Sequence, residues 1–331
     1  MSAYERPLEL VDLPDPEPQR ADEVLLRIGG AGVCATDLHA IDGLMGAAGV
    51  TVPRVLGHEN AGWVQEVGDG VSTVAPGDAV IVFPPHSCGL CLPCRRGLDM
   101  HCERHQFTGL TVDGGFAEYL VVPERSLIKL PDGVAPADIA PHADAGLTAY
   151  HAIRRVAHRL VPSSTAVVIG IGGVGHIALQ LVRELGSGRV IAVDTDARRR
   201  RLAQELGADE VVDGAAAVRE LTGGRGADVV FDFVGTDATH AAGVEMLGRF
   251  GVFAIVGYGG TLSIPTGMMV GEEKGAFASL VGTWPDLYEI VQLHATGRLT
   301  LRSQTHPLDE INDVLDALRE GEVTGRAVLV P

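Results

Sequence analysis

The sequence has no uncharged apolar run long enough to cross a lipid bilayer. Its most apolar window, residues 166–182, is interrupted by four glycines and by His176. A transmembrane helix needs about 20 consecutive apolar residues, so a membrane span is not expected. The first 18 residues are acidic and rich in proline, without the basic and then apolar segments of a secretion signal. The sequence therefore predicts a cytoplasmic protein.

Basic charge is also scarce. The chain has 26 Lys and Arg residues against 43 Asp and Glu residues, a formal net charge of −17. A surface with this excess of negative charge repels the phosphates of nucleic acids and of anionic lipids. Neither nucleic acid nor a membrane surface is therefore expected as a partner.

Cysteine is rare, but its placement is informative. Four of the five cysteines are Cys88, Cys91, Cys94 and Cys102. In a chain without a secretion signal, such a group indicates a metal site rather than disulfides. Four thiolates suit tetrahedral zinc and leave no open position for a substrate, and residues 84–106 have little apolar pattern of their own. We therefore predict a lobe held by structural zinc; a redox Cys-x-x-Cys pair is the alternative.

The chain has 331 residues, a length that suits two domains, and its pattern of apolar residues and turns changes along the sequence. The first 140 or so residues predict a mostly β domain, with strands at 23–28, 62–67, 79–83 and 116–122. From residue 165 apolar strands alternate with helices, which is typical of a parallel sheet covered on both faces. These strands are expected at 165–169, 189–193, 210–212, 229–234, 252–256 and 277–281. The helices are expected at 172–185, 197–206, 287–296 and 308–320, before a closing strand at 326–330.

A glycine-rich turn follows the predicted strand at 165–169 and opens a helix. It reads Gly170-Ile171-Gly172-Gly173-Val174-Gly175. In this context Gly170 permits a tight turn, Gly172 lets the backbone approach a pyrophosphate, and Gly175 lets the helix pack on the sheet. The helix N-terminus favours the phosphates. The turn predicts a dinucleotide site.

The acidic residue after the next strand bears on the choice of dinucleotide. Asp194 lies 19 residues beyond Gly175, close to where a ribose-binding acid is expected. Its carboxylate can accept both ribose hydroxyls of NAD and repels the 2′-phosphate of NADP, so we predict NAD. Residues 198–201 are four arginines that could either neutralise that phosphate or form a solvated helix face. Arg199 is expected beside the adenosine ribose.

A second group of ligand-type residues lies in the first domain. Cys34 begins the run Cys34-Ala35-Thr36-Asp37-Leu38-His39, and His58 and Glu59 follow. Catalytic zinc uses a few ligands of mixed type and keeps a position for water or substrate. Thiolate, imidazole and carboxylate would form such a set. Singly, each residue is also typical of a packed core, as free cysteines often are.

Together these motifs resemble the zinc-containing medium-chain alcohol dehydrogenases. The family's zinc signature matches every fixed position of Gly57-His58-Glu59-x2-Gly62-x5-Gly68-x2-Val71. The cysteine spacing and residues 170–175 are similar to its structural-zinc lobe and coenzyme fingerprint, over essentially the whole chain. The resemblance implies an α/β plus β fold. It has a GroES-like catalytic domain at 1–145, an inserted Rossmann domain with a doubly wound parallel sheet at 146–288, and a return to the catalytic domain at 289–331.

The resemblance also implies two zinc ions per chain and NAD. Cys34 and His58 are the implied catalytic ligands, with Glu59 binding the metal directly or intermittently. A further ligand, Cys in the best-known animal enzymes, falls on Asp144, as in several bacterial relatives, with His142 as the competitor.

Two further positions concern the cofactor phosphates. Ala35 stands where some relatives have an arginine that meets the pyrophosphate. Arg326 resembles a phosphate-contacting arginine of the family, although it is equally typical of the start of a final strand.

The implied reaction interconverts a primary or secondary alcohol and its aldehyde or ketone by hydride transfer with NAD. Zinc activates the alcohol, since it lowers the pKa of bound water from about 15.7 to about 7. Thr36 and His39 are expected to carry the proton to solvent. Asp37 is expected either in the reaction or behind a ligating histidine such as His58.

Two other functions remain open. The run from Cys34 to His39 is also common in zinc-dependent polyol and sugar dehydrogenases. A non-catalytic, zinc-stabilised nucleotide-binding protein would need the lobe and the glycine turn alone. The resemblance further implies a homodimer or homotetramer paired through the edge of the Rossmann sheet. The candidates for the substrate pocket are Leu44, Met45, Phe107 and Trp284.

Overall fold

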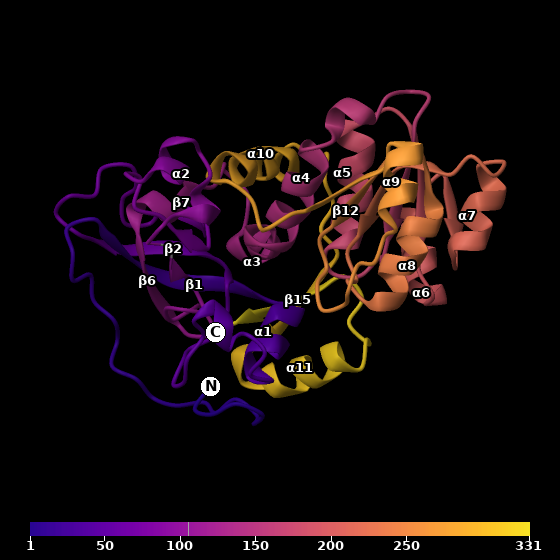
Figure 1. Cartoon of the computed structure of the whole chain (residues 1–331). Coiled ribbons are helices and arrows are strands. Elements are labelled where there is room, and N and C mark those ends of the chain that lie inside the picture. The colour runs from indigo at the N-terminus through magenta and orange to yellow at the C-terminus, as the bar shows by residue number, and fades with distance from the viewer. Residues whose placement is uncertain (105) are drawn as a thin grey trace. The chain divides into compact units, whose positions relative to one another are not determined.

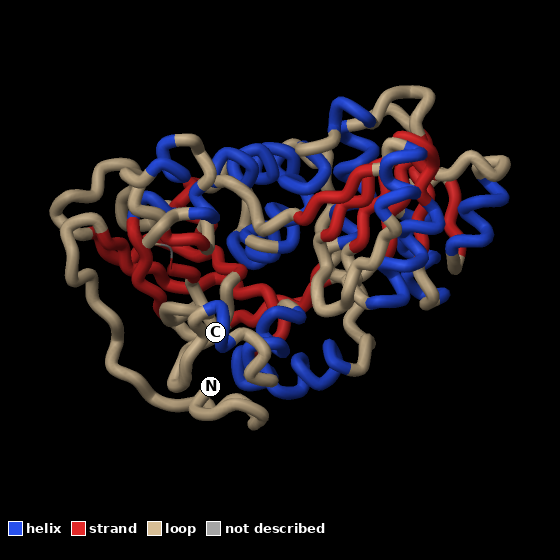
Figure 2. The backbone as a smooth tube through the Cα atoms, viewed as in Figure 1, coloured by secondary structure: helices blue, strands red, loops and turns tan. Residues whose placement is uncertain are grey.

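The computed structural model describes residues 1–104 and 106–331. The chain forms two compact units. Unit 1 comprises Met1–Leu147, Thr283–Gly297 and Leu301–Pro331, and unit 2 comprises Thr148–Gly282 and Arg298–Thr300. Strands form the centre of each unit and helices lie outside them (Figures 1 and 2). Among the described helices none combines the length and hydropathy needed to span a bilayer.

Unit 1 is built on a seven-stranded sheet in which β1 is the main organiser. The strand order is β14-β15-β1-β2-β3-β7, and β6 also pairs with β1. All pairings are antiparallel except the parallel pair β14 and β15. The strands are β1 (Glu23–Val33), β2 (Glu59–Val67), β3 (Ala79–Val82), β6 (Tyr119–Pro123), β7 (Leu127–Lys129), β14 (Ser303–Pro307) and β15 (Arg326–Val330). Val24, Leu26 and Ile28 of β1 are buried in one apolar cluster of this sheet.

The helices of unit 1 are short, and two of them close a second core. Leu38 and Ile41 of α1 pack in one cluster with Ile311 and Val314 of α11, whose apolar residues recur at helical spacing. The elements are α1 (Ala35–Ile41), η1 (Gly46–Ala48), β4 (Pro85–His86), α2 (Leu92–Arg95), η2 (Asp99–His101), β5 (Gln106–Phe107), η3 (Glu124–Ser126), α3 (Pro136–Ile139), η4 (Ala140–Ala143), α10 (Trp284–Ala295), η6 (Leu308–Glu310) and α11 (Ile311–Arg319). The chain passes into unit 2 through α4 (Ala145–Arg154).

Unit 2 contains a six-stranded parallel sheet. Its order is β10-β9-β8-β11-β12-β13, so the direction of winding reverses between β8 and β11. This is the strand order of the doubly wound dinucleotide-binding fold, whose ligands bind beyond the carboxyl ends of the strands at the reversal. The elements are η5 (Ala157–Arg159), β8 (Thr165–Ile169), α5 (Gly175–Leu185), β9 (Arg189–Val193), α6 (Ala197–Glu205), β10 (Glu210–Val212), α7 (Ala215–Leu221), β11 (Ala227–Asp232), α8 (Asp237–Met246), β12 (Leu247–Ile255), α9 (Thr266–Glu272) and β13 (Gly275–Ala278).

Two predicted strands in unit 2 are wrong at their ends. The strand expected at 229–234 stops at Asp232, because that carboxylate accepts hydrogen bonds from the N–H groups of Val234 and Gly235 and turns the chain. The strand expected at 277–281 stops at Ala278, and Val281 has a positive φ of 45°. Such a backbone conformation is incompatible with a β-strand.

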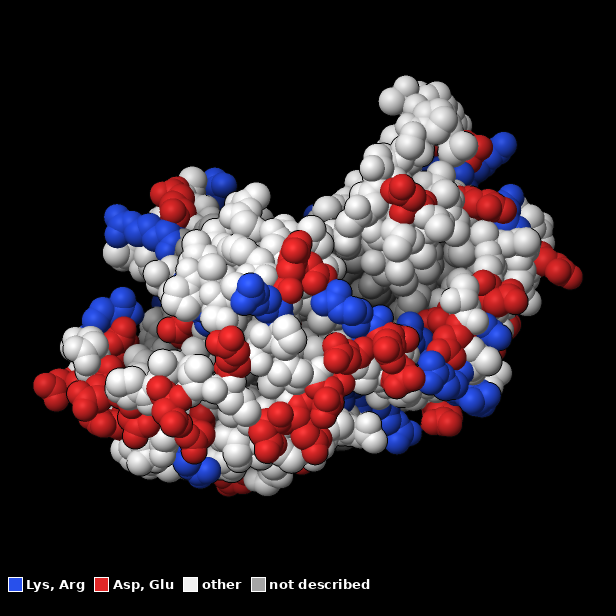
Figure 3. All heavy atoms as spheres, turned by 90° about the horizontal axis from the view of Figure 1, so that it is seen from below, with Lys and Arg blue, Asp and Glu red and all other residues white. Residues whose placement is uncertain are grey.

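Acidic side chains are spread over the face shown in Figure 3, with smaller groups of basic ones among them. This distribution agrees with the formal net charge of −17.

Candidate active site

Four ligand-type side chains meet at one point in unit 1. Cys34 follows β1 and caps α1, Glu59 begins β2 next to His58, and Asp144 follows η4. One donor atom from each of the four lies within 4.8 Å of the others. Sulfur, nitrogen and carboxylate oxygen form the mixed donor set that catalytic zinc uses. His142, the competitor to Asp144, does not belong to this cluster.

Asp37 fixes two members of the cluster from behind. Its Oδ1 accepts a hydrogen bond from His58 Nδ1 at 3.1 Å, and its Oδ2 accepts one from the Cys34 N–H at 2.9 Å. The Asp37 side chain is fully buried. A carboxylate in this position fixes the orientation of a ligating histidine and raises its basicity.

The other ring nitrogen of His58 provides the test of whether a metal ion fits. Among the described residues His58 Nε2 has no hydrogen-bond partner, although it is buried, and it lies 3.6 Å from Asp144 Oδ2. A buried polar atom without a partner is costly. A metal ion bound by Nε2, the Asp144 carboxylate and the Cys34 thiolate would satisfy it, so the residues fit the ion.

Arg326 lies in the same buried region, where it forms an ion pair with Glu59. The other oxygen of Glu59 accepts a hydrogen bond from the Ala145 N–H at 3.2 Å. Burial raises the pKa of Glu59 to about 7, against the opposing positive charge of Arg326. For His58 burial alone would lower the pKa, but Asp37 and then Asp144 raise it well above its ordinary value. Burial is thus the main cause for Glu59 and neighbouring carboxylates are the cause for His58, and carboxylates gathered beside a buried imidazole favour a cation.

Helix α1 carries all three residues expected to assist the reaction. Thr36 lies beside the cluster, with its Oγ1 3.8 Å from Cys34 Sγ, and is partly exposed. His39 is also partly exposed and follows on the same helix, while Asp37 is turned into the core. The helix thus separates one buried carboxylate from two side chains that reach solvent.

The four residues named as pocket candidates lie in different surroundings. The Phe107 ring centroid is 6.3 Å from that of His58, so Phe107 borders the cluster. Met45 packs against the core shared by α1 and α11, and Leu44 is 71% exposed. Trp284 begins α10, where its indole donates to the Leu127 carbonyl at 3.3 Å and stacks on Tyr288.

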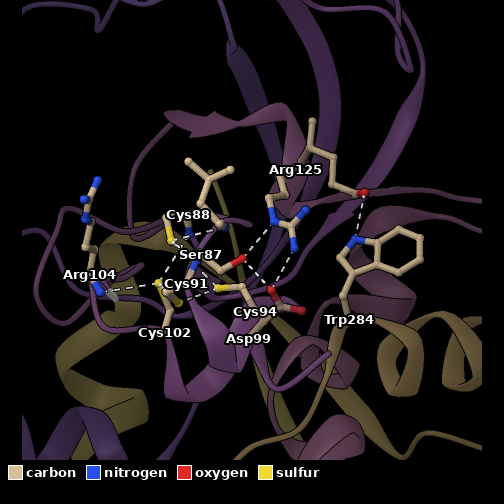
Figure 4. Close-up of polar contacts among 11 residues, drawn as sticks. Ser87, Cys88, Cys91, Cys94, Asp99, Cys102, Arg104, Arg125 and Trp284 are labelled. Atoms are coloured by element: carbon tan, nitrogen blue, oxygen red, sulfur yellow. Dashed lines mark hydrogen bonds and ion pairs between the residues drawn. The ribbon is translucent and has the colours of Figure 1, made fainter. Parts of the chain in front are cut away.

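The four cysteines of the lobe converge as a second ligand group (Figure 4). None of the four forms a disulfide, and the Sγ atoms of Cys91 and Cys94 are 3.3 Å apart. Backbone N–H groups point at the sulfurs, including those of Leu90 and Cys91 at 3.4 Å from Cys88 Sγ. These donors lower the pKa of Cys88 to about 6. Four sulfurs in a closed group match a structural zinc site.

A polar clamp next to the lobe could not be anticipated from the sequence. Arg125, in η3, donates to Ser87 Oγ and to Asp99 Oδ1, both at 2.9 Å (Figure 4). Ser87 also donates to Asp99 at 2.6 Å. The clamp ties both ends of the lobe to the turn between β6 and β7. Its members are separated in sequence and form no spacing pattern.

The glycine turn after β8 has the geometry of a phosphate-binding turn. Gly170 has a φ of 84°, and a Cβ there would lie 2.4 Å from a methyl carbon of Val234. A Cβ on Gly175 would lie 1.7 Å from the Gly170 carbonyl oxygen, whereas one on Gly172 would meet nothing within 4 Å. Gly170 and Gly175 are therefore required by the protein itself, and Gly172 leaves space open. Gly173 and Val174 complete the turn before α5.

Asp194 is tied to this turn. Its Oδ2 accepts from the Ile171 N–H at 2.7 Å, and its Oδ1 accepts from the Asp196 N–H at 2.9 Å. Two of the four consecutive arginines bind groups close by in the sequence. Arg198 forms an ion pair with Asp196, and Arg200 donates a hydrogen bond to the Asp194 carbonyl at 2.8 Å. Arg199 lies in the first turn of α6, half-buried. The carboxylate is thus held at the carboxyl end of β9, next to the glycine turn.

Two tertiary contacts, one within the ligand cluster and one at the neighbouring helix η4, could not be predicted from the sequence. Glu59 and Arg326 pair although most of the chain separates them. His142 Nε2 lies 3.1 Å from His294 Nδ1, so η4 is tied to α10. No local pattern signals either contact; only the antiparallel pairing of β15 with β1 brings Arg326 near.

Sequence families and known structures agree with this arrangement. Residues 20–132 match the alcohol dehydrogenase GroES-like domain, and residues 173–296 match the zinc-binding dehydrogenase family. The crystal structure of the alcohol dehydrogenase from Aeropyrum pernix is similar, with a TM-score of 0.97 and 44% identity over 100% of this chain and 98% of that chain.

Two curated relatives differ in their named activities. The D-arabinose 1-dehydrogenase (NADP(+)) of Saccharolobus solfataricus is 36% identical over 100% of this chain and 96% of its own. An NAD-dependent alcohol dehydrogenase of Sulfurisphaera tokodaii is 34% identical over 98% of this chain and 97% of its own. With both domains matched and relatives aligned along their full length, the chain belongs to the zinc-dependent medium-chain dehydrogenase/reductase family.

Proposed function

We propose that the protein is a zinc- and NAD-dependent alcohol dehydrogenase that interconverts a primary or secondary alcohol and its aldehyde or ketone. The observation that carries this proposal is the buried donor cluster of Cys34, His58, Glu59 and Asp144, in a chain that also has a six-stranded dinucleotide-binding sheet. A structural or sensor protein would need the cysteine lobe and the glycine turn, but not this cluster. The name of the Sulfurisphaera relative supports the same activity and cofactor.

In this proposal Cys34, His58 and Asp144 hold the catalytic zinc, and Glu59 binds it directly or intermittently. The four lobe cysteines hold a second, structural zinc. When bound, the catalytic zinc supplies a Lewis acid that lowers the pKa of an alcohol. Asp37 keeps His58 Nε2 turned toward the zinc site. The 3.1 Å hydrogen bond between Asp37 Oδ1 and His58 Nδ1 supports this role.

NAD supplies the hydride acceptor, and the residues of unit 2 hold it. The glycine turn at 170–175 receives the pyrophosphate, and Asp194 receives the ribose, with Arg199 beside it. The buried ion pair of Arg326 with Glu59 supports a role at the metal site. A contact between Arg326 and a cofactor phosphate stays a prediction.

The proton of the alcohol leaves through α1. Thr36 accepts it at its hydroxyl and donates its own proton onward, and His39 passes a proton to solvent. Partial exposure of both side chains supports this route.

A sugar or polyol is the second candidate substrate. It is favoured by the name of the Saccharolobus relative, a D-arabinose 1-dehydrogenase that is 36% identical to this chain. The name of that relative also includes NADP(+), whose 2′-phosphate one of the arginines at 198–201 could neutralise.

The remaining features of the proposal concern assembly and location. We infer a homodimer or homotetramer paired through an edge of the parallel sheet, where β10 and β13 each have one neighbouring strand among the described residues. The domain borders at residues 145 and 288, and a cytoplasmic location, belong to the same proposal. Light scattering of the purified protein measures the assembly, and a monomer would contradict it.

One experiment tests the function. The purified protein, loaded with zinc, is assayed with NAD and with NADP against primary alcohols, secondary alcohols, sugar alcohols and aldoses. We expect reduction of NAD with a simple alcohol, and two zinc ions per chain by elemental analysis. Faster turnover of sugar alcohols or aldoses than of simple alcohols would favour a polyol or sugar dehydrogenase. No hydride transfer from any of them would refute the proposal.

A further inference from the structure

A buried carboxylate in unit 2 is not accounted for by the reaction. Asp232 ends β11 and is fully buried. Its Oδ1 accepts from the N–H groups of Val234 at 2.8 Å and Gly235 at 3.1 Å. Its Oδ2 lies 3.0 Å from His240 Nδ1. A carboxylate removed from water is stable only when such donors surround it.

His240 connects this carboxylate to the next helix. It lies in the first turns of α8, only 3% exposed, with its ring edge-on to Phe253 at 6.0 Å between centroids. The hydrogen bond from Nδ1 to Asp232 therefore joins the end of β11 to the start of α8. It closes the short loop that runs from residue 233 to residue 236.

This loop occupies the place where the parallel sheet changes its direction of winding. The Phe233 N–H donates to the Ile169 carbonyl at the end of β8, and Val234 lies against Gly170. On its other side the loop touches the segment after β12, where a Cβ on Gly235 would lie 2.1 Å from the Gly257 carbonyl carbon. The loop is thus packed between the phosphate-binding turn and the next strand's loop.

Val234 is 44% exposed and lies between the partly buried Phe233 and the buried Gly235. In doubly wound sheets the dinucleotide lies across the reversal, and the strands that follow it receive the second mononucleotide half. The first half contains the glycine turn and Asp194, which serve the adenosine side. An apolar side chain exposed beyond the end of β11 therefore faces the nicotinamide side.

We propose that His240 and Asp232 are positioning residues that hold residues 233–235 in the shape required by the nicotinamide half of NAD. The inference rests on the proposed function. The carboxylate fixes the backbone through two N–H groups, and His240 fixes the carboxylate. Without the imidazole donor, Asp232 retains one oxygen without its partner in a buried place, and the loop relaxes to satisfy it.

Asparagine and leucine at position 240 separate the hydrogen bond from packing. In His240→Asn the amide nitrogen replaces Nδ1 at nearly the same distance from Cβ. In His240→Leu a similar volume has no donor, and in His240→Gln the donor is moved one bond outward. Glu245→Ala, an exposed change on the same helix, is the matched control.

The readouts are NADH dissociation constants from nucleotide fluorescence, kcat at saturating NAD, zinc content and Tm. We expect the Kd for NADH to rise on the order of tenfold in His240→Leu. His240→Asn and the control should bind NADH as the wild type does, and in these two variants kcat at saturating NAD and zinc content should stay within about twofold of wild type.

Several outcomes would overturn the inference. Wild-type affinity in His240→Leu would do so, and equal weakening by Leu and Asn would assign the effect to packing. If the leucine variant does not fold, the decision passes to Asn and Gln, and equal NADH affinity in those two would contradict the proposal. Failure of the proposed function is distinguishable, because then the wild-type protein itself either binds no NADH or transfers no hydride between NAD and any of the alcohols and sugars tested.

Discussion

At the residue scale, the proposed chemistry depends on which polar side chains of α1 are buried and which are exposed. Asp37 is buried and holds His58, while Thr36 and His39 are partly exposed. The buried residue can orient a ligand but has no route to solvent. The exposed pair can exchange protons but does not fix the metal site. This division makes the roles separable by substitution.

Replacing Thr36 with Ala should remove the first acceptor of the proton path and leave the donor cluster intact. Positioned acid–base groups contribute on the order of 10² to 10⁴ in rate, so kcat should fall at least about 100-fold. Zinc content by elemental analysis should remain at the wild-type level. Thr36→Ser, which keeps a hydroxyl, should retain most of the rate. An unchanged kcat in the alanine variant would show that the proton leaves by another path.

At the element scale, the turn between β8 and α5 contains glycines with different duties. Gly170 has a positive φ and touches Val234, whereas a Cβ on Gly172 would meet no protein atom within 4 Å. In the proposed function, this open space is where the pyrophosphate approaches the backbone.

Alanine at these two positions should have opposite effects. Gly172→Ala should keep its Tm and raise KM for NAD, because the methyl group lies where the pyrophosphate approaches. Gly170→Ala should lower stability by about 1 to 3 kcal/mol through the strained backbone and the contact with Val234. Thermal unfolding and steady-state kinetics measure both. A lower Tm in Gly172→Ala with normal KM would contradict this assignment.

The contact between α10 and η4 makes stability depend on pH. Burial lowers the pKa of His294, with a smaller raising effect from Asp138. The unfolded chain therefore takes up this proton before the folded chain does, so the stability present above the ordinary pKa is lost as the pH falls through the folded value.

Replacing His294 with Asn keeps a hydrogen-bonding group near His142 but removes this titration. Tm of the wild type should therefore fall more steeply than that of His294→Asn between about pH 7.5 and pH 5.5. His158→Asn, at an exposed position, should keep the wild-type slope. Parallel curves for wild type and His294→Asn would rule out this source of acid sensitivity.

The elements differ in how far the sequence predicts them. β8, β9, β10 and β15 have the predicted bounds, because they are apolar runs ended by Gly, Pro or charged residues. The short helices α1, α7 and α8 have no comparable periodicity and were not expected. β11 ends early because of hydrogen bonds made by one side chain, Asp232, which no strand pattern encodes.

Residues of the candidate site are likewise predictable only where a local sequence pattern indicates them. Cys34, His58 and the lobe cysteines follow from spacing and donor chemistry, since ligand types recur at fixed intervals. The pairing of Glu59 with Arg326 depends on two strands that meet only in the folded sheet, and the bond between Asp232 and His240 depends on the path of one loop. Such contacts are determined by tertiary packing.

At the scale of the whole molecule, the two groups of metal-ligating residues differ in their donor atoms and in their expected coordination. The donor residues of the first cluster are buried or nearly so, with the Asp144 side chain 13% exposed, whereas Cys88 and Cys91 of the lobe are partly exposed. The groups differ instead in coordination, because a catalytic zinc site keeps an open position where a chelator can bind and four thiolates leave none. The lobe sulfurs form a closed group in a segment with few apolar residues, so a zinc ion bound there would contribute to the stability of the fold.

A chelator should therefore remove zinc in two stages. The first equivalent should leave quickly with loss of activity and little change in Tm. The second should leave slowly and lower Tm, because the lobe loses its crosslink. Zinc release followed by a colorimetric indicator, together with activity and thermal unfolding, measures both stages. Simultaneous release of both ions, with a single drop in Tm, would contradict this picture.

Unit 1 is formed by three separate stretches of the chain, and this has a consequence for folding during synthesis on the ribosome. β1, which leads directly into Cys34, pairs on one side with β15, and Glu59 pairs with Arg326. Unit 2 is translated between these partners, so it can reach its native state while the surrounding unit still lacks an edge of its sheet. The four donors of the metal site precede unit 2 in the chain, but Arg326, the partner of Glu59, follows it, so the wall of the pocket that Arg326 forms is added last.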